Sequence, residues 1–376
     1  MKIFQSVYQN QHWHSPLPQS AKAQWLLAFG DHNAMSSDDF RQELKSAFPQ
    51  AQIIGCTTSG EIQGNLIFDN SICLTAVEFS SSNIHVVSDA IGNYKNSDDL
   101  ISHLLCQLPD DGLKHVFIIS DGQLVNGSEL VDGLQRHLPE GVTATGGLAG
   151  DGDKFEQTTV WHNDRVENGL VVVAGFYGDN LNIGHGNLGG WHPFGPKRII
   201  TKSQANVLLE IDNQPALDLY KNFLGEFADG LPASALLYPL ALQLEGESEQ
   251  LVRTILSIDE ESKSMVFAGN MPEGSSCQLM QSNYEDLIDG AQMAAKQALS
   301  SNEQIHPELA ILISCVGRRL VLGQRVEEEL EIIEDTFPSN CAFSGFYSYG
   351  EISPIKAIGR CGLHNQTMTI TLFSEN

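Results

Sequence analysis

The sequence predicts an α/β fold whose mixed sheets are built from repeated β-α-β-β units, with helices covering the sheets and two domains packed tightly together. The first observation is that three stretches of the chain repeat one plan: an apolar strand, an amphipathic helix, a Gly-centred turn and a closing apolar strand. Internal similarity on this scale decides the architecture before any single motif does. The second observation is spacing, because the helices carry apolar residues three or four apart, whereas the flanking runs are short and rich in Val, Ile, Leu and Phe.

The first stretch shows every part of this plan. Its parts are, in order, the apolar run at 25–29, a helical face of Phe40, Leu44 and Phe48, the turn Gly-Cys-Thr-Thr-Ser-Gly-Glu-Ile at 55–62 and the closing strand at 72–79. Residues 36–39, Ser-Ser-Asp-Asp, offer N-cap side chains and early negative charge to the helix. The helix is therefore expected to begin just before Phe40.

The second and third stretches follow the same order of elements. The second comprises the run at 116–119, a helical face of Leu130, Leu134 and Leu138, the turn at 146–150 and the closing strand at 170–176. The third comprises the run at 309–313, a helical face of Val326, Leu330, Ile333 and Phe337, the turn at 345–352 and the closing strand at 368–373. Because Gly-Glu-Ile recurs at 60–62 and 350–352, we expect the first and third units to face each other across a pseudo-symmetric interface.

A region of different character separates the second and third units. It contains a Gly-rich, aromatic segment at 184–196 that is expected to be a loop, strands at 198–201 and 207–211, a helix at 215–224, a hairpin of 251–258 with 264–268, and a helix at 283–299. The chain has no long low-complexity linker, so its halves are expected to pack tightly. We therefore expect two domains, at 22–217 and 218–376.

Composition limits the function. The formal net charge of −26 repels phosphate backbones and anionic lipid headgroups, so nucleic-acid binding is not expected. Residues 1–15 lack the apolar core of a signal peptide, and the apolar run at 231–242 contains two prolines and is too short to span a membrane. A cytoplasmic protein without direct membrane insertion is therefore expected.

The motifs of the best-known enzyme classes are missing or out of context. Residues 184–189 have the spacing of a dinucleotide fingerprint, but Pro193 and Pro196 follow where its helix should run. Walker A, His-Glu-x-x-His and Gly-x-Ser-x-Gly sequences are absent. The 55–60 turn can present a nucleophile at Cys56, Thr57 or Thr58, but a tight turn whose hydroxyls bind turn amides is the favoured interpretation. We expect a protein that is not an enzyme.

The seven cysteines contain no Cys-x-x-Cys pair, so free thiols are expected rather than disulfides. Cys361 and His364 are spaced so that they can bind one metal ion, with Cys315 and Cys341 as further ligands if the fold brings them together. Buried cysteines that act as small apolar residues are the favoured interpretation. Zinc binding or redox sensing through Cys315, Cys341, Cys361 and His364 stays open as an alternative.

The most suggestive cluster lies at 189–198, Gly-Gly-Trp-His-Pro-Phe-Gly-Pro-Lys-Arg. His192 offers an imidazole that can ligate iron, and Trp191 and Phe194 offer aromatic faces for a flat macrocycle. Two cations, one of them Arg198, can pair with haem propionates. A rigid turn packed on the sheet, with His192 merely exposed, explains the same residues.

Several motifs, in order along nearly the whole chain, resemble the signatures of FIST-domain proteins, which have a FIST N and a FIST C part. They are the turn at 55–62, Gly-Trp-x-Pro-x-Gly at 190–195, Glu-Ile-Asp-x-x-Pro-Ala at 210–216, Ser-Cys-x-Gly-Arg at 314–318, Gly-Phe-Tyr-Ser-Tyr-Gly-Glu-Ile at 345–352 and His-Asn-Gln-Thr-Met-Thr at 364–369. The resemblance implies a bacterial signal-input module that binds a small ligand and works with a histidine kinase, a cyclic-di-GMP enzyme or a chemotaxis receptor.

A chain of this size without an attached output domain is further similar to the NosP group of haem-binding nitric oxide sensors, which act on a partner histidine kinase. The resemblance implies b-type haem ligated by a histidine. His185, His192 and His364 lie in blocks that match the family, and we expect His192 to ligate the iron because its aromatic and basic neighbours suit a haem edge. Nitric oxide is then the expected gas ligand, in two-component or cyclic-di-GMP signalling.

A sensor of an amino acid or another small metabolite is the nearest alternative, with the ligand held between the two domains. Candidate residues for its pocket come from the recurring Gly-Glu-Ile turns and from the Ser-Cys-x-Gly-Arg motif. They are Thr57, Ser59, Glu61, Ser348, Glu351 and Arg318. Assembly into a homo-oligomer also stays open.

Overall fold

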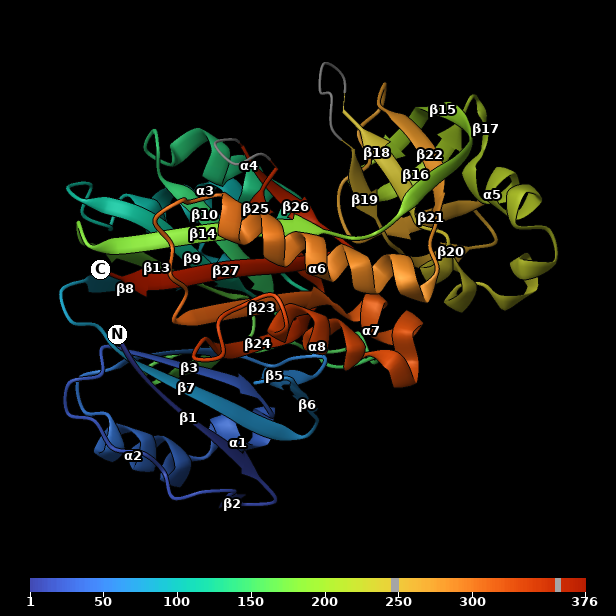
Figure 1. The fold of residues 1–376 in the computed structure, drawn as a ribbon. Coiled ribbons are helices and arrows are strands. Elements are labelled where there is room, and N and C mark those ends of the chain that lie inside the picture. The colour runs from blue at the N-terminus through green and yellow to red at the C-terminus, as the bar shows by residue number, and fades with distance from the viewer. Residues whose placement is uncertain (245–249, 356–359) are drawn as a thin grey trace.

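The computed structural model describes residues 1–244, 250–355 and 360–376. Within these residues the strands form four sheets in a mixed α/β fold (Figure 1). Three sheets surround one common core, and the fourth lies to one side, at the upper right of Figure 1. We call them the first-unit, second-unit, third-unit and fourth sheets. The predicted fold class is confirmed, including the repeated β-α-β-β units.

Each unit has its own sheet. In spatial order, the first-unit sheet contains β12 (Arg165–Glu167), β11 (Val160–His162), β4 (Gln52–Cys56), β3 (Trp25–Gly30), β7 (Ser71–Glu78), β1 (Lys2–Gln9) and β2 (His12–Trp13). The second-unit sheet contains, in the same sense, β26 (Cys361–His364), β25 (Gly350–Pro354), β10 (Thr143–Leu148), β9 (Leu113–Ser120), β13 (Leu170–Tyr177) and β8 (Asn83–Ala90). The third-unit sheet contains β14 (Leu181–Leu188), β27 (Met368–Glu375), β23 (Leu309–Cys315), β24 (Ala342–Ser348), β5 (Glu61–Gln63) and β6 (Leu66–Phe68).

Each unit sheet contains four strands in an equivalent arrangement. A parallel pair lies beside an antiparallel third strand and an antiparallel fourth strand, in the orders β4-β3-β7-β1, β10-β9-β13-β8 and β24-β23-β27-β14. A parallel pair needs a crossover connection, and helices supply it in every unit. These helices are α1 (His32–Ser36) and α2 (Asp38–Ala47), α4 (Gly127–His137), and α7 (Val316–Leu322) with η4 (Gly323–Arg325) and α8 (Glu328–Glu334).

Local sequence explains where these helices begin. Ser37 accepts a hydrogen bond from the Phe40 N–H and so caps α2, as predicted. Two further helices, α3 (Ser97–Leu105) and α6 (Tyr284–Ser300), precede the second and third units. The Asn283 side chain caps α6 by accepting from the Asp286 N–H. None of the helices in the described ranges is long and apolar enough to cross a membrane.

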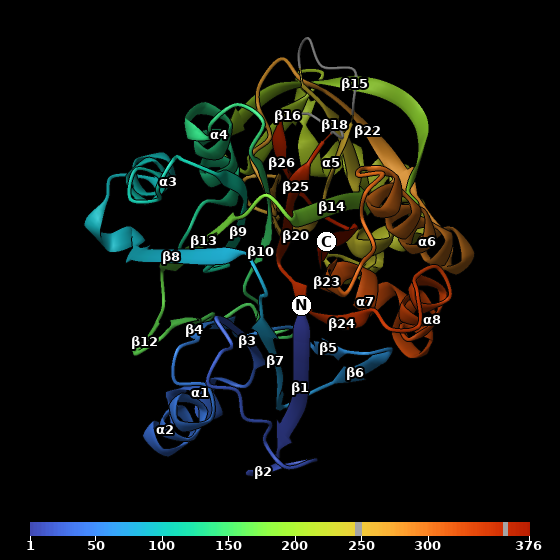
Figure 2. The same cartoon turned by 60° about the vertical axis from the view of Figure 1, so that its left-hand side comes forward.

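A cyclic exchange of hairpins ties the three units together. After its second strand, each unit sends a short hairpin into the sheet of another unit: β5-β6 joins β24, β11-β12 joins β4, and β25-β26 joins β10. Figure 2 shows the first unit below, the second at the upper left and the third at the right. The expected interface between the first and third units, which is β5 against β24, is therefore one of three equivalent contacts.

One glycine in the second strand of each unit is required by this pairing. A Cβ at Gly55, Gly146 or Gly345 would lie 2.0, 1.9 or 1.8 Å from the carbonyl oxygen of Ala28, Ile118 or Leu312, its partner residue on the first strand. Such a distance is far below van der Waals contact, so the strands can approach only where the side chain is a hydrogen atom.

Gly345→Ala is accordingly expected to lower the free energy of unfolding by about 3 kcal/mol, because the backbone of two buried strands must separate. Urea denaturation measures the change. Gly92→Ala is the control, since a Cβ there meets nothing within 4 Å, and it should change stability by about 0.5 kcal/mol or less. Equal effects of the two substitutions would contradict this account of the repeat.

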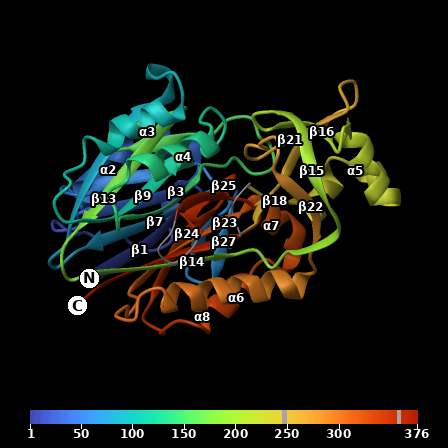
Figure 3. The same cartoon turned by 90° about the horizontal axis from the view of Figure 1, so that it is seen from above.

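The common core lies where the inner faces of the three unit sheets meet. The Trp25 ring of the first unit contacts Phe117 and Phe176 of the second and Phe373 of the third, with ring centroids 5.7, 4.8 and 5.5 Å apart. Helices cover the outer faces: α2 the first-unit sheet, α3 and α4 the second, and α6 and α8 the third. Figure 3 shows α6 and α8 on the side of the molecule opposite α3 and α4.

The fourth sheet is inserted between β14 and α6. In spatial order it contains β19 (Leu251–Arg253), β18 (Leu240–Gln243), β22 (Ser276–Gln281), β15 (His192–Gln204), β16 (Val207–Ile211), β21 (Ser264–Phe267) and β20 (Ile255–Asp259), with β17 (Gln214–Pro215) beside β16. α5 (Ala216–Leu224) packs on it, followed by η2 (Gly225–Gly230) and η3 (Ala233–Leu237). The expected domain boundary after residue 217 falls within this sheet, because β15, β16 and β17 precede it and the other strands follow it. The third-unit sheet also combines both parts of the chain, since β5, β6 and β14 come from the N-terminal part.

The Gly-rich segment that begins at Gly184 differs from the sequence interpretation, because its first part is a strand. Residues 181–188 form β14, which pairs with β27 along its whole length. A Cβ at Gly184 or Gly186 would lie 2.5 or 2.2 Å from the Ala298 or Ala294 carbonyl of α6. The glycines therefore allow close helix-on-strand packing rather than a loop.

Candidate functional site

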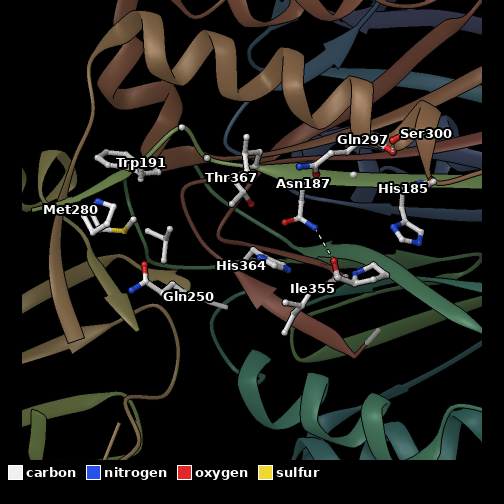
Figure 4. A pocket seen from close by; sticks show the side chains of 18 residues that line it. His185, Asn187, Trp191, Gln250, Met280, Gln297, Ser300, Ile355, His364 and Thr367 are labelled. Carbon is white, nitrogen blue, oxygen red and sulfur yellow. Dashed lines mark hydrogen bonds between the residues drawn. The ribbon is translucent and has the colours of Figure 1, made fainter. Parts of the chain in front are cut away.

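A cavity lies at the junction between the three-unit core and the fourth sheet. It has a volume of about 620 Å³, within the usual range of ligand pockets. Its walls come from β14, α6, β25-β26 and the fourth sheet, and Figure 4 shows the side chains that line it. We call it the histidine cavity, after His185 and His364. Its other lining residues include Asn187, Leu188, Trp191, Gln250, Val252, Met280, Gln297, Ser300, Ile355 and Thr367.

His364, at the end of β26, has a defined tautomer. Its Nε2 lies 3.1 Å from the Ser353 carbonyl oxygen, which can only accept, so Nε2 carries the proton and Nδ1 keeps a lone pair. A histidine whose second nitrogen donates to a backbone carbonyl is the usual arrangement of a metal ligand. Burial lowers the pKa of His364 to about 4, so the imidazole is neutral, as a ligand must be, at physiological pH.

His185 faces the same cavity from β14. Its backbone N–H donates to the Ser301 Oγ at 2.9 Å, which ties this part of β14 to the end of α6. Asn187 lies two residues further on the same face of the strand, and its amide donates to the Ser353 Oγ and the Pro354 carbonyl. These bonds fix β14 against β25, so the two imidazoles are held on two rigid elements.

The side chains expected to hold haem lie in different places in the structure. Trp191 is buried, lines the histidine cavity and donates its Nε1–H to the Gln366 carbonyl at 3.0 Å. His192 points elsewhere, because its side chain is 64% exposed and its Nε2 lies 3.5 Å from the Asp286 carboxylate. Phe194 packs on the core of the fourth sheet, and Arg198 pairs with Asp212 at 2.9 Å. The geometry thus favours His364 and His185 over His192 as ligands of a group bound at the junction.

The donor set of the histidine cavity fits haem. Imidazole and thioether are both common axial ligands of haem iron, and His364, His185 and Met280 line the cavity. Trp191 supplies an aromatic wall.

The two glutamates of the Gly-Glu-Ile turns occupy equivalent positions and share one bonding pattern. Glu61 accepts from the hydroxyls of Thr58 and Ser71 at 2.6 and 2.8 Å. Glu351 accepts from those of Ser348 and Thr367 at 2.7 and 2.9 Å. The hairpin register places Val160 at the same position in the second unit, so the repeat does not require a carboxylate.

Burial raises the pKa of Glu61 to about 7 and of Glu351 to about 8. Glu61, Thr57 and Ser59 line a second, polar cavity of about 390 Å³, whereas Ser348 and Glu351 are fully buried. Of these candidates, therefore, only those from the first turn line this cavity.

Arg318, also a pocket candidate, is fully buried and holds the junction together. The fourth sheet joins the core through two links, 189–191 and 282–283. The Arg318 guanidinium donates to the Gly189 carbonyl of one link at 2.6 Å and to the Leu287 carbonyl, just beyond the other, at 2.7 Å. Glu329 balances its charge at 2.9 Å. Arg318 is thus a positioning residue, since its donors are engaged within the protein.

The cysteines named as alternative zinc ligands do not lie together. Cys315 ends β23, whereas Cys341 precedes β24, which runs parallel to β23, so they lie at opposite ends of the sheet. Cys361 belongs to the second-unit sheet and lies 3.8 Å from the Ala144 carbonyl oxygen. Within residues 1–244, 250–355 and 360–376, no group of three or more His, Cys, Asp or Glu side chains is placed to hold a metal ion. Burial raises the pKa of all three thiols.

Sequence reasoning had no signal for two lining residues, Met280 on β22 and Gln250 directly before β19. They meet His364 only because the inserted sheet folds back on β25-β26, a contact between segments far apart in the chain. The alternation of His185 and Asn187 was visible, but it indicates a strand face only once 181–188 is known to be a strand.

Comparison with known proteins identifies the family. The model of the FIST N domain matches residues 24–214, and that of the FIST C domain matches residues 216–354. An uncharacterised protein of Methanocaldococcus jannaschii is 24% identical over an alignment of 355 residues, which covers 82% of this chain and 65% of that relative. The chain thus spans slightly less than two thirds of the relative's length.

Among solved structures, the chain is similar to cyanuric acid hydrolase from A. caulinodans, with 10% identity, 78% of this chain and 68% of that chain covered, and a TM-score of 0.24. A likeness this weak indicates neither a common fold nor a shared activity. The two domain models, in contrast, together cover most of the chain in the expected order. The chain therefore belongs to the FIST family, whose domains are sensor domains of signal transduction.

Proposed function

We propose that this chain is a non-catalytic sensor that holds b-type haem in the histidine cavity, responds to nitric oxide and regulates a partner histidine kinase. The observation that carries the proposal is the placement of two imidazoles, His364 and His185, on one cavity at the junction. When bound, haem supplies an iron that nitric oxide can ligate. His364 is the proposed iron ligand, because its Nε2–H is engaged by a backbone carbonyl and its Nδ1 keeps the lone pair.

The position of the cavity supports a sensory role. A ligand shifts a conformational equilibrium only if it binds one state better than the other. The histidine cavity takes walls from both the three-unit core and the fourth sheet, so a ligand there contacts both bodies and favours one arrangement of them. The output is expected as a change in autophosphorylation of the partner kinase when nitric oxide is added.

Absorbance of the haem-loaded protein tests the assignment. The purified protein is loaded with haem and reduced without oxygen, and its spectrum is recorded before and after nitric oxide. We expect a stoichiometric Soret band that shifts with the gas. His364→Ala should alter the ferrous spectrum and weaken haem retention about tenfold or more, as loss of a ligand does.

His192→Ala is the matched control and should behave like the wild type, because His192 is exposed and outside the cavity lining. The reverse pattern, with a normal spectrum for His364→Ala and an altered one for His192→Ala, would indicate that His192 of the 189–198 segment ligates the haem. Loss of haem from the wild type on washing would contradict the haem assignment and favour a FIST sensor of another small ligand.

A further inference from the structure

A second open site lies between the fourth sheet and the core, and it shares no lining residue with the histidine cavity. It consists of two cavities of about 740 and about 530 Å³ that share Phe155, Leu256, Ala268 and Tyr349. The rings of Phe155 and Tyr349 stack at 4.5 Å where the cavities meet. We call the joined space the apolar trough, and its larger part the apolar chamber.

Exposed apolar side chains concentrate in this trough. In the part of the chain that the structure describes, twelve large apolar side chains are well exposed, and six of them line the trough. They are Leu124, Phe155, Leu237, Leu256, Tyr284 and Leu320, with exposed fractions of 40 to 60%. Scattered single residues need no explanation, but a contiguous set in a hollow is typical of a binding site.

The lining indicates the charge of the occupant. Asp153 is the sole charged side chain among the described lining residues, and the whole chain carries a formal charge of −26. An anionic ligand would therefore enter without a cationic partner and against the field of the protein. The smaller cavity carries carboxamides instead, namely Gln123, Asn126, Asn206 and Asn270, which bind uncharged polar groups.

The apolar chamber also contains a hydrogen-bonding group that the fold leaves unused. Thr254 lines it and is 4% exposed, and its Oγ1 has no hydrogen-bond partner among the described residues. A buried hydroxyl without a partner costs about 1–3 kcal/mol, and among the described residues Thr254 is the one with such an unpaired side-chain atom that also lines the trough. A ligand with a carbonyl or hydroxyl oxygen beside its apolar part would satisfy it after rotation of the Thr254 side chain, because Oγ1 is almost inaccessible in the free protein.

We propose that the apolar trough binds a neutral amphiphile, with its apolar chain in the chamber of Leu256 and Leu320, an uncharged oxygen against Thr254 and its polar head toward the carboxamides. The site lies across the same junction as the histidine cavity but does not depend on haem. It would make the protein responsive to a second class of small molecule, which also contacts both bodies.

Displacement of the neutral fluorescent probe N-phenyl-1-naphthylamine tests the proposal. Decanamide, decanoate and decylammonium, which have equal chain lengths and neutral, negative and positive heads, compete for the site. We expect decanamide to displace the probe at a concentration at least tenfold below that of decanoate. Leu256→Asp should abolish probe binding, whereas Leu66→Asp should not, because Leu66 is a still more exposed leucine on a strand outside the trough.

Thr254→Val separates a ligand role from a structural one. Loss of an unpaired buried hydroxyl should raise the Tm of the free protein by about 1–3 °C. It should also weaken decanamide binding about fivefold or more and leave binding of the probe unchanged. Equal affinity for decanoate, probe binding by Leu256→Asp, or an amphipathic helical peptide binding the trough while decanamide does not, would each overturn the proposal.

Discussion

Arg318→Ala is expected to lower the free energy of unfolding by about 3–5 kcal/mol, the cost of breaking a fully buried ion pair. The Arg318 and Glu329 side chains are 0% exposed, so the substitution leaves the Glu329 carboxylate buried without its countercharge. It also removes the donors to the Gly189 and Leu287 carbonyls that hold both links of the fourth sheet. Urea denaturation measures the loss.

Arg325→Ala is the control, because it also removes an arginine charge, from the short helix η4 that follows the helix of Arg318. Arg325 pairs with Glu285 and Glu328, but its side chain is 35% exposed, so the expected loss is about 1 kcal/mol or less. A comparable loss from both substitutions would show that Arg318 contributes only as an ordinary surface cation and would contradict its role at the junction.

A decline of stability with rising pH, caused by Glu61 and Glu351, is the second large effect. Burial raises their pKa values in the folded protein to about 7 and about 8, above the ordinary value of 4.5. A carboxyl with a raised folded-state pKa contributes stability that is complete below the unfolded pKa and is lost as the pH rises through the folded pKa. Between pH 6.5 and 8 the two groups together should reduce the free energy of unfolding by roughly 2 kcal/mol.

The double variant Glu61→Gln/Glu351→Gln isolates this effect, because a carboxamide mimics the neutral acid and does not titrate. His115, His162 and His364, whose pKa values burial lowers, contribute in the opposite direction at lower pH, but equally in both proteins. The variant should therefore gain stability relative to the wild type as the pH rises. Parallel pH profiles of the two proteins would show that these carboxyls do not titrate in this range.

The units could be predicted from the sequence because each contains its own strand and helix periodicity. The exchange of hairpins could not, because β5 pairs with a strand about 280 residues away and its three residues carry no register signal. α7 was missed because it begins directly after β23, without a capping side chain. At Gly184 and Gly186 local composition indicated a loop, but these residues form a strand that packs closely against α6.

The sequence grouped Trp191, His192, Phe194 and Arg198 around one haem, whereas the structure places their side chains in different surroundings. His192 was expected to ligate the iron and Trp191 to lie against the macrocycle beside it, although neighbouring residues of an extended chain point to opposite sides. The structure shows this division directly, with Trp191 buried at 8% exposure and the His192 side chain 64% exposed. Which side faces a cavity depends on β26 and β14, and no local pattern in 189–198 contains that information.

Amide hydrogen exchange at the two links, 189–191 and 282–283, tests the sensory account most directly, since both links connect the bodies that line the histidine cavity. The ferrous haem-loaded protein would be compared with and without nitric oxide. We predict a change in protection at both links that is lost in His364→Ala and kept in His192→Ala. A shifted Soret band with unchanged exchange at both links would show that the gas binds without altering the junction, and it would contradict the account.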